Sequence, residues 1–312
     1  MGCALVGGEA LIDFISRDAG KTLSEAEIFE KRIGGSPLNV AVGLSRLGDE
    51  VEFLSKVADD PFGKGILDFL KKEGIGTSHM VVDRGGKTAL AFVSLADGKP
   101  QFTFYGADAS YTKLTFDEID VDTDDVDIFH FGSISMLSSP TSETLMNLFQ
   151  KLSGRTITSF DPNVRPDLVE DRKSFLDLIG PILKGVDILK LSDEDLEFIW
   201  DGDFETFVKA FERKGKLTIL TLGERGSVLS WGEEFLKIPA SRLEKVVDTT
   251  GCGDAYMAGV LHVILEGGLD SKSAVKAAKF GSVVAGIVAG RLGAASSMPT
   301  LEEALKIWGG SM

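Results

Sequence analysis

A glycine-flanked turn followed by an acid is the stretch of this sequence whose residues could do chemistry together. Residues 248–259 read Asp-Thr-Thr-Gly-Cys-Gly-Asp-Ala-Tyr-Met-Ala-Gly, and an apolar run continues to Leu265. That run is long and apolar enough for a buried helix, so Gly251 and Gly253 lie where the helix begins. The free N–H groups and the dipole at a helix N-terminus attract anions. Glycine lets such an anion approach the backbone.

The carboxylate of Asp254 stands directly beside this expected anion site. It has a function there if the anion is a phosphoryl group in transfer, because it can accept the proton of the attacking hydroxyl. The alternative is that the turn is only a tight loop and that Asp254 caps the helix. Cys252 shares the turn, and a helix N-terminus lowers the pKa of a thiol. We therefore expect Cys252 to react with thiol reagents.

A second glycine pair precedes another predicted helix. Gly34 and Gly35 lead into apolar residues at helical spacing, and Asn39 falls in the first turns of that helix. Nearer the start, Asp13 lies within the apolar segment 10–15, where an unpaired carboxylate is costly to bury. From the residues alone, these features indicate a loop, a helix and a solvent-facing strand residue.

Strands and helices alternate along the chain. Residues 3–7 predict a short buried strand that opens a parallel sheet. Later elements are expected as strand 128–131, helix 141–152, strand 156–160, helix 171–183, strand 188–191, helix 203–214 and strand 217–222. This rhythm predicts an α/β fold whose mostly parallel central sheet carries helices on both faces. No repeat or low-complexity linker divides the chain, so residues 1–312 are interpreted as one domain.

Polar residues follow three of the predicted strands, at the edge of the sheet where ligands tend to bind. In chain order they are Asp161, Asn163 and Arg165, then Lys190, Ser192 and Asp195, then Thr221, Gly223 and Gly226. Each segment taken alone could be a loop chosen for its turn chemistry. Their order along one chain is what makes the pattern specific.

Together, these segments resemble the motifs of the pfkB (ribokinase-like) carbohydrate kinases, from about residue 4 to residue 300. Residues 248–254 resemble the family's C-terminal signature, roughly Asp-Thr-x-Gly-Ala-Gly-Asp, with Cys252 in place of Ala. Residues 34–48 resemble its N-terminal signature. The opening that ends at Asp13 and the segment 161–165 are most similar to fructokinase-type members. The resemblance implies a ribokinase-like three-layer fold with a small β-sheet lid.

The resemblance also implies a function, ATP-dependent phosphorylation of a sugar hydroxyl with Mg²⁺ as cofactor. Asp254 would be the catalytic base, and the backbone of Gly251, Cys252 and Gly253 would form the anion hole. The sugar would be bound by Asp13, Gly34, Gly35, Asn39 and Arg165. The nucleotide would be contacted by Lys190, Ser192, Thr221, Gly223, Gly226, Gly251 and Gly253. A monovalent cation such as K⁺ would lie near Asp248 and Thr249. Asp195 would hold Mg²⁺ through water, although the family's Asn-x-x-Glu motif reads Ser192-x-x-Asp195 here.

Two strand-like segments, 88–95 and 101–105, flank Asp97-Gly98, a pair typical of hairpin turns. The resemblance implies that residues 12–33 and 87–108 form the lid over the sugar, and that a homodimer forms through it. The alternative is a hairpin within the main sheet.

Composition excludes several other classes of protein. The net charge of −15 argues against nucleic acid or an anionic membrane surface as a partner. The two cysteines lie far apart in the sequence, and the three histidines show no metal-ligand spacing. The N-terminus lacks the features of a signal peptide and no apolar run reaches membrane-spanning length, so we expect a cytoplasmic protein.

Fructose is the expected sugar. Fructokinases and 2-keto-3-deoxygluconate kinases commonly carry Arg after the second lid strand, whereas Gly106 stands here. An acid sugar needs a cationic partner, and Arg165 is the main candidate left. The alternatives are 2-keto-3-deoxygluconate, another sugar or nucleoside, and a sugar-binding regulator without catalysis, against which Asp254 argues.

Two nucleotide-binding motifs are absent. Gly-Lys-Thr at residues 86–88 lacks the leading glycine of a P-loop and precedes a strand-like segment. Tyr256 stands where a dinucleotide fingerprint needs its third glycine, which disfavours an NAD-linked dehydrogenase.

Overall fold

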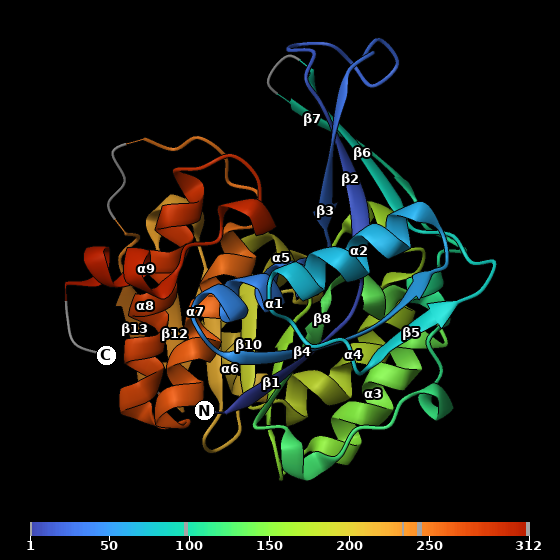
Figure 1. The fold of residues 1–312 in the computed structure, drawn as a ribbon. Coiled ribbons are helices and arrows are strands. Elements are labelled where there is room, and N and C mark those ends of the chain that lie inside the picture. The colour runs from blue at the N-terminus through green and yellow to red at the C-terminus, as the bar shows by residue number, and fades with distance from the viewer. Residues whose placement is uncertain (1, 97–98, 233, 242–244, 310–312) are drawn as a thin grey trace.

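A large sheet forms the centre of the molecule. The structure is a computed structural model that describes residues 2–96, 99–232, 234–241 and 245–309. In this part of the chain the sheet has the order β13-β12-β11-β10-β9-β8-β1-β4-β5 (Figure 1). Its strands are β1 (Cys3–Gly7), β4 (Glu50–Ala58), β5 (Met80–Asp83), β8 (Ile128–Gly132), β9 (Ile157–Asp161), β10 (Ile188–Ser192), β11 (Leu217–Thr221), β12 (Ser227–Trp231) and β13 (Glu234–Ile238). Neighbours from β11 to β5 pair parallel, while β12 and β13 are antiparallel. The predicted mostly parallel central sheet is confirmed.

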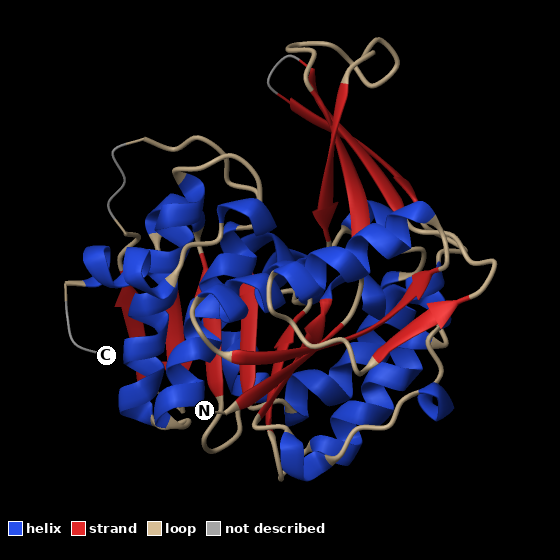
Figure 2. Ribbon diagram, in the orientation of Figure 1, coloured by secondary structure: helices blue, strands red, loops and turns tan. Residues whose placement is uncertain are grey.

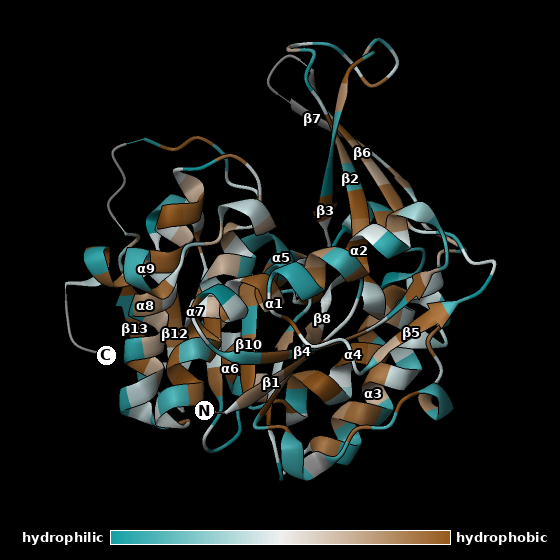
Figure 3. Cartoon of the chain, viewed as in Figure 1, coloured by the Kyte–Doolittle hydropathy of each residue, from teal (hydrophilic) through white to brown (hydrophobic). Residues whose placement is uncertain are grey.

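Helices cover both faces of this sheet, which gives three layers (Figure 2). One face packs against α1 (Ser36–Arg46), α2 (Pro61–Lys72), α7 (Cys252–Gly267), α8 (Ser271–Ala289) and α9 (Leu301–Trp308). The other packs against α3 (Thr141–Leu152), α4 (Arg172–Gly185), α5 (Asp193–Ile199) and α6 (Phe204–Phe211). Neighbouring residues of a strand divide between the two cores: Val6 joins the first and Leu5 the second, because side chains alternate across a sheet. Figure 3 shows hydrophobic residues along these strands.

A second, smaller sheet projects from one end of the body (Figure 1). Its order is β3-β2-β6-β7, from β2 (Leu11–Ser16), β3 (Phe29–Gly34), β6 (Leu90–Ala96) and β7 (Lys99–Tyr105). These strands come from the two segments expected to form a lid. Antiparallel pairing of β6 with β7 confirms the predicted hairpin, and its expected Asp97-Gly98 turn lies outside the described residues.

Along the described chain, no helix is both long enough and apolar enough to cross a membrane.

Candidate active site

Asp254 lies in the first turn of α7, at the edge of the sheet where the parallel strands end. Its side chain is almost fully buried, with 6% of the residue exposed. The Ser36 hydroxyl donates to Asp254 Oδ1 at 2.7 Å, and the Asn39 amide donates to Oδ2 at 2.7 Å. Both donors come from the first turn of α1, so the N-termini of two helices converge on one carboxylate. The dipoles of both helices favour negative charge at this point.

Small residues allow these two helices to approach each other. A Cβ atom added to Gly43 of α1 would lie 2.5 Å from the Cβ atom of Ala258 in α7. No side chain longer than hydrogen therefore fits at residue 43 without moving one helix. This close contact brings Asn39, one turn earlier in α1, to Asp254.

A second buried acid supports the start of α1. The carboxylate of Glu9 accepts a hydrogen bond from the Ser36 N–H at 3.1 Å and another from the Ser135 hydroxyl. It thereby satisfies a free N–H at the helix N-terminus, where the preceding residue, Gly35, has no side chain to do so. Burial raises the pKa of Glu9 to about 7, against the opposing effect of its hydrogen bonds.

The turn before α7 has the backbone geometry expected of an anion site. Gly251 is the N-cap residue in a left-handed conformation (φ 79°), which glycine adopts without strain. A Cβ atom there would lie 2.6 Å from the Cβ atom of Ala294, so the turn packs closely on Ala294. No side chain caps the helix. The first N–H groups of α7 are thus left without a capping side chain.

Burial brings the pKa of Asp254 closer to neutrality. Desolvation raises its pKa from 3.8 to about 6, although the hydrogen bonds from Ser36 and Asn39 lower it. The nearby charge of Asp161 adds to the rise, and that of Lys190 opposes it. A general base is most effective when its pKa is close to the working pH.

Lys190 and Asp161 form a buried ion pair next to the glycine turn. Lys190 Nζ lies 2.8 Å from Asp161 Oδ2, with both side chains almost fully enclosed. Burial opposes the lysine charge, yet Asp161 and Asp195 outweigh this effect and raise the pKa of Lys190. A Cβ atom on Gly253 would lie 3.1 Å from the same Nζ atom, so the ammonium group borders the turn.

Asp13 is a partly buried acid without a partner among the described residues. It lies in β2 of the small sheet, and no group of the described residues donates a hydrogen bond to it or forms an ion pair with it. Burial raises the pKa of Asp13 to about 6. The neighbouring Gly34 leaves room for the Asp13 carboxylate, which a Cβ atom at residue 34 would overlap. This region therefore holds two hydrogen-bond acceptors without a donor in the described chain, the Asp13 carboxylate and the Asn39 Oδ1 atom.

The residues expected to contact nucleotide follow β10 and β11, as the sequence predicts. Lys190 is the middle residue of β10 and Ser192 its last, Thr221 ends β11, and Gly223 and Gly226 form the turn before β12. Both glycines have positive φ angles, 58° and 86°.

Asp195 and Arg165 are engaged by their own surroundings. The Asp195 carboxylate accepts hydrogen bonds from Ser192 N and Oγ and from Val164 N, so it completes the cap of α5 and holds the loop that follows β9. Arg165 is exposed, and its guanidinium donates to Asn163 and to the Val164 carbonyl. No hydrogen bond joins it to the residues around Asp254 within the described chain. The roles predicted for both residues stay predictions.

Asp248 organises the turn before α7. Its carboxylate accepts hydrogen bonds from the N–H and hydroxyl of Thr250 and from the Gly293 N–H at 2.9 Å. Burial opposes its charge, but these bonds and Arg32 together lower the pKa of Asp248. Thr249 is exposed, and its carbonyl accepts a hydrogen bond from Cys252 N. Within the described residues, no three His, Cys, Asp or Glu side chains form a metal-binding group.

The expectation that the helix N-terminus lowers the pKa of the Cys252 thiol is wrong. Burial, reinforced by the charges of Asp248 and Asp254, raises the pKa of this thiol to about 12. The helix N-terminus favours a thiolate, but the two carboxylates beside it and the loss of solvent outweigh that effect.

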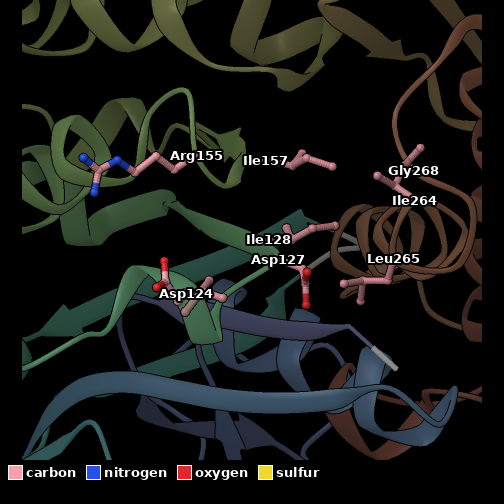
Figure 4. Close-up of a pocket in the computed structure, with 9 residues that line it drawn as sticks. Asp124, Asp127, Ile128, Arg155, Ile157, Ile264, Leu265 and Gly268 are labelled. Carbon is pink, nitrogen blue, oxygen red and sulfur yellow. The ribbon is translucent and has the colours of Figure 1, made fainter.

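Two open cavities lie at the opposite edge of the sheet, away from these residues. One, of about 710 Å³, is bordered by the first residues of β8 and β9 and by the C-terminal end of α7 (Figure 4). The other, of about 820 Å³, is lined largely by acids, including Glu50, Glu52 and Asp127. Neither contains a residue predicted to bind sugar or nucleotide.

The fold is shared with solved sugar kinases. An uncharacterized sugar kinase from Pyrococcus horikoshii is 36% identical, and the match covers 96% of this chain and 93% of that protein. Its crystal structure in complex with ATP has a TM-score of 0.86 over 97% of both chains. Fructokinase-1 of Zea mays is 35% identical over 96% of this chain and 95% of its own length. A fructokinase from Xylella fastidiosa with bound ATP is 28% identical, with a TM-score of 0.86 over 98% of this chain and 97% of that chain.

These similarities make the protein a carbohydrate kinase, a phosphotransferase with an alcohol group as acceptor. The model of the pfkB family of carbohydrate kinases matches residues 3–301, and this chain belongs to that family. The family and the fold class predicted from the sequence are both confirmed.

Three residues of the site were not assigned a role from the sequence. Ser36 holds Asp254, Glu9 caps α1, and Asp161 pairs with Lys190. The signal that could have found Glu9 is an acid between two apolar segments, and Asp161 and Lys190 are charged residues within apolar strands.

Proposed function

We propose that this kinase transfers the γ-phosphoryl group of ATP to a hydroxyl of a ketose, with fructose as the substrate. The observation that carries the proposal is the setting of Asp254. It is a buried carboxylate with a pKa of about 6, placed where two helix N-termini meet and beside an uncapped glycine turn. A base and an anion site side by side are what transfer from a phosphate to a hydroxyl requires.

In this reaction Asp254 accepts the proton of the sugar hydroxyl as the hydroxyl oxygen forms its bond to phosphorus. The bond from phosphorus to the ADP oxygen breaks, and ADP keeps the electron pair. The N–H groups of Gly251, Cys252 and Gly253 stabilise the charge on the transferred group. Ser36 and Asn39 hold the carboxylate in one orientation throughout.

The sugar site is formed by Asp13, Gly34, Gly35, Asn39 and Arg165. The hydroxyls of a sugar are donors, and the unpartnered Asp13 carboxylate and Asn39 Oδ1 atom are acceptors. The small sheet that carries Asp13 acts as a lid, which excludes water from the transfer. We also propose that two copies of the chain associate through this sheet, where Tyr105 is 63% exposed. Sedimentation of wild type and Tyr105→Lys tests this association.

The nucleotide site is formed by Lys190, Ser192, Thr221, Gly223 and Gly226. Lys190 brings a positive charge to the glycine turn, where phosphate would lie. Mg²⁺ would neutralise charge on the phosphates. Because Mg²⁺ keeps several waters and binds mainly to substrate phosphates in such sites, one carboxylate such as Asp195, acting through water, would suffice. A monovalent cation would lie near Asp248 and Thr249.

A neutral sugar fits the charges around the site better than an acid sugar. At residue 106, a Cβ atom would overlap the ring of Phe104, so the ring occupies the space that a longer side chain would take. Arg165 already donates to its own loop. The fructokinases among the relatives support the same assignment. The second candidate is 2-keto-3-deoxygluconate, which Arg165 would favour if its guanidinium turned towards the sugar.

The test is kcat/KM for fructose and for 2-keto-3-deoxygluconate under identical ATP and Mg²⁺, measured by ADP release. We expect fructose to be preferred and Arg165→Ala to leave this preference unchanged. A tenfold or greater preference for the acid that Arg165→Ala abolishes would reverse the substrate assignment. Absence of ADP release with every sugar of a broad panel would instead favour a sugar-binding regulator.

A further inference from the structure

Arg32 joins the small sheet to a loop of the main body. Its Nη1 atom donates to the Leu292 carbonyl at 3.0 Å and to the Ser296 hydroxyl at 3.4 Å. Arg32 lies in β3, whereas the loop follows α8, some 260 residues later in the chain. Its side chain is largely buried, with 17% exposed. The same guanidinium pairs with Glu30 at 2.9 Å, which orients it from within the small sheet.

Arg32 makes these contacts instead of the one that the strand register offers. It stands directly opposite Asp13 in the antiparallel pair of β2 and β3, so the two side chains lie on one face of the sheet. Yet among the described residues no ion pair joins them. Because the guanidinium is directed to the loop, the Asp13 carboxylate keeps its acceptor atoms free.

The loop that accepts the hydrogen bonds of Arg32, residues 291–297, lies against the glycine turn. Gly293 N–H donates to Asp248, whose carboxylate also holds Thr250. Ala294 packs on Gly251, with no room for a Cβ atom between them. From the side of the body, Arg46 donates to the Ser296 carbonyl at 3.2 Å, so the loop is held from both sides. A displacement at Leu292 would therefore reach the turn through contacts that leave little free space.

We propose that Arg32 is a positioning residue that fixes the small sheet, the loop 291–297 and the glycine turn relative to one another. It acts through the loop and touches neither the sugar nor the phosphate. This inference rests on the proposed function, in which the small sheet carries the sugar-binding Asp13 and the glycine turn holds the phosphoryl group. Both halves of the reaction then depend on one guanidinium.

The test compares Arg32→Gln and Arg32→Lys with a matched control, Arg17→Gln. Arg17 directly follows β2 of the small sheet and pairs with the same Glu30, but none of its hydrogen bonds in the described chain reaches the loop. Each variant is measured in three ways: steady-state kinetics with fructose and ATP, thermal unfolding, and amide hydrogen exchange of the free enzyme over residues 248–254 and 291–297.

We expect Arg32→Gln to lower kcat/KM for fructose roughly 5- to 20-fold, the size expected when a partly exposed charged hydrogen bond is lost. The KM for ATP should change less than kcat/KM for fructose, because the proposed nucleotide site also includes the turn at residues 223–226, to which Arg32 makes no hydrogen bond. Hydrogen exchange should quicken at residues 248–254 and 291–297 alone. Arg32→Lys, which keeps the charge, should recover part of the activity, and Arg17→Gln should match wild type.

Arg32→Gln that behaves like Arg17→Gln in kinetics and exchange would overturn the proposal. So would faster exchange across the whole chain with a matching fall in Tm, because that pattern belongs to general destabilisation. The exchange comparison needs no turnover. If wild type phosphorylated no sugar, the proposed function would fail, while the exchange data would still decide whether Arg32 fixes the loop and the turn.

Discussion

Burial of the Asp254 carboxylate has two consequences: it raises the proton affinity of the group, and it lowers the stability of the fold. The substitution Asp254→Asn tests both. The amide has nearly the same shape, and the Ser36 hydroxyl can donate to its oxygen as it does to Asp254 Oδ1. The new amide nitrogen would meet the Asn39 nitrogen, which now donates to Oδ2. Rotating the Asn39 amide presents Oδ1, an acceptor without a partner in the described residues. We therefore expect the variant to keep the shape of the site.

Its activity should nevertheless fall, because an amide cannot take the proton of the sugar hydroxyl. We expect kcat to drop roughly 10²- to 10⁴-fold, the usual contribution of a positioned general base, with little change in the sugar KM. In wild type, kcat should decline as the pH is lowered through about 6, because Asp254 must be unprotonated to act as a base. ADP release at saturating fructose and ATP measures both effects.

The folding stability of Asp254→Asn should exceed that of wild type, but only above about pH 4. The folded-state pKa of Asp254 lies above the ordinary 3.8, so the folded protein binds this proton more tightly than the unfolded chain does. The Asp254 carboxylate therefore destabilises the fold progressively between about pH 4 and pH 6, and fully above that range. The difference between 3.8 and about 6 corresponds to at most roughly 3 kcal/mol. Since about 1 kcal/mol moves Tm by about 2–4 °C, Asp254→Asn should melt several degrees higher at pH 8 and alike at pH 4.

Asp161→Asn is the control of opposite sign. This acid is equally buried but paired with Lys190, so its loss leaves an enclosed ammonium group unpaired and should lower the free energy of unfolding by about 3–5 kcal/mol. A Tm of Asp254→Asn that equals or falls below wild type at pH 8 would refute the burial argument. If Asp254→Asn turned over at a rate close to that of wild type, Asp254 would not be the catalytic base.

Three further predictions concern the other groups of the site. Asp13→Ala and Asn39→Ala should each raise the sugar KM roughly 5- to 100-fold, because a buried hydroxyl of the sugar loses an acceptor. Nucleotide binding without sugar should barely change. An equal loss of sugar affinity and nucleotide affinity would contradict the assignment of these residues to the sugar site. Cys252→Ala should keep kcat within a few-fold of wild type. Alkylation of the wild-type thiol should be slow at pH 8, because the pKa of this thiol is raised to about 12. Rapid modification with full loss of activity would contradict this prediction. Adding Lys190→Met to Asp161→Asn should recover much of the stability that Asp161→Asn loses, while the activity of the double variant stays low. A fully active double variant would exclude a phosphate-binding role for Lys190.

The parts of the fold that could be predicted are those fixed by local pattern. The apolar run after Asp254 has no polar face, and residues 254–264 of α7 are indeed all buried. The alternation after residue 125 gave the parallel strands and most of their helices. The short helix α5 was missed, because its start depends on a reciprocal cap between Ser192 and Asp195 that was interpreted as a metal motif. The strands β12 and β13 follow the last predicted strand and extend the sheet antiparallel.

The parts of the site that could not be predicted are contacts between residues distant in the sequence. Ser36 and Asp254 are 218 positions apart, and Arg32 and Leu292 are 260 apart. Nothing in the local pattern around either serine or arginine indicates these partners. The Cys252 thiol shows the same limit: its helix N-terminus is visible in the sequence, whereas its burial, the larger influence on its pKa, depends on the fold.

The placement of Lys190 distinguishes two neighbouring acids, Asp161 and Asp254, of which Asp254 is the proposed base. Its ammonium group binds Asp161 at 2.8 Å and borders Gly253, while Asp254 is held only by the neutral donors Ser36 and Asn39. Asp161 is thus in direct contact with a buried cation. Asp254 has no such contact, so desolvation dominates and its pKa rises to about 6. In the proposed reaction, the ion pair therefore keeps a positive charge beside the glycine turn that holds the phosphate, and Asp254 is left to take the proton.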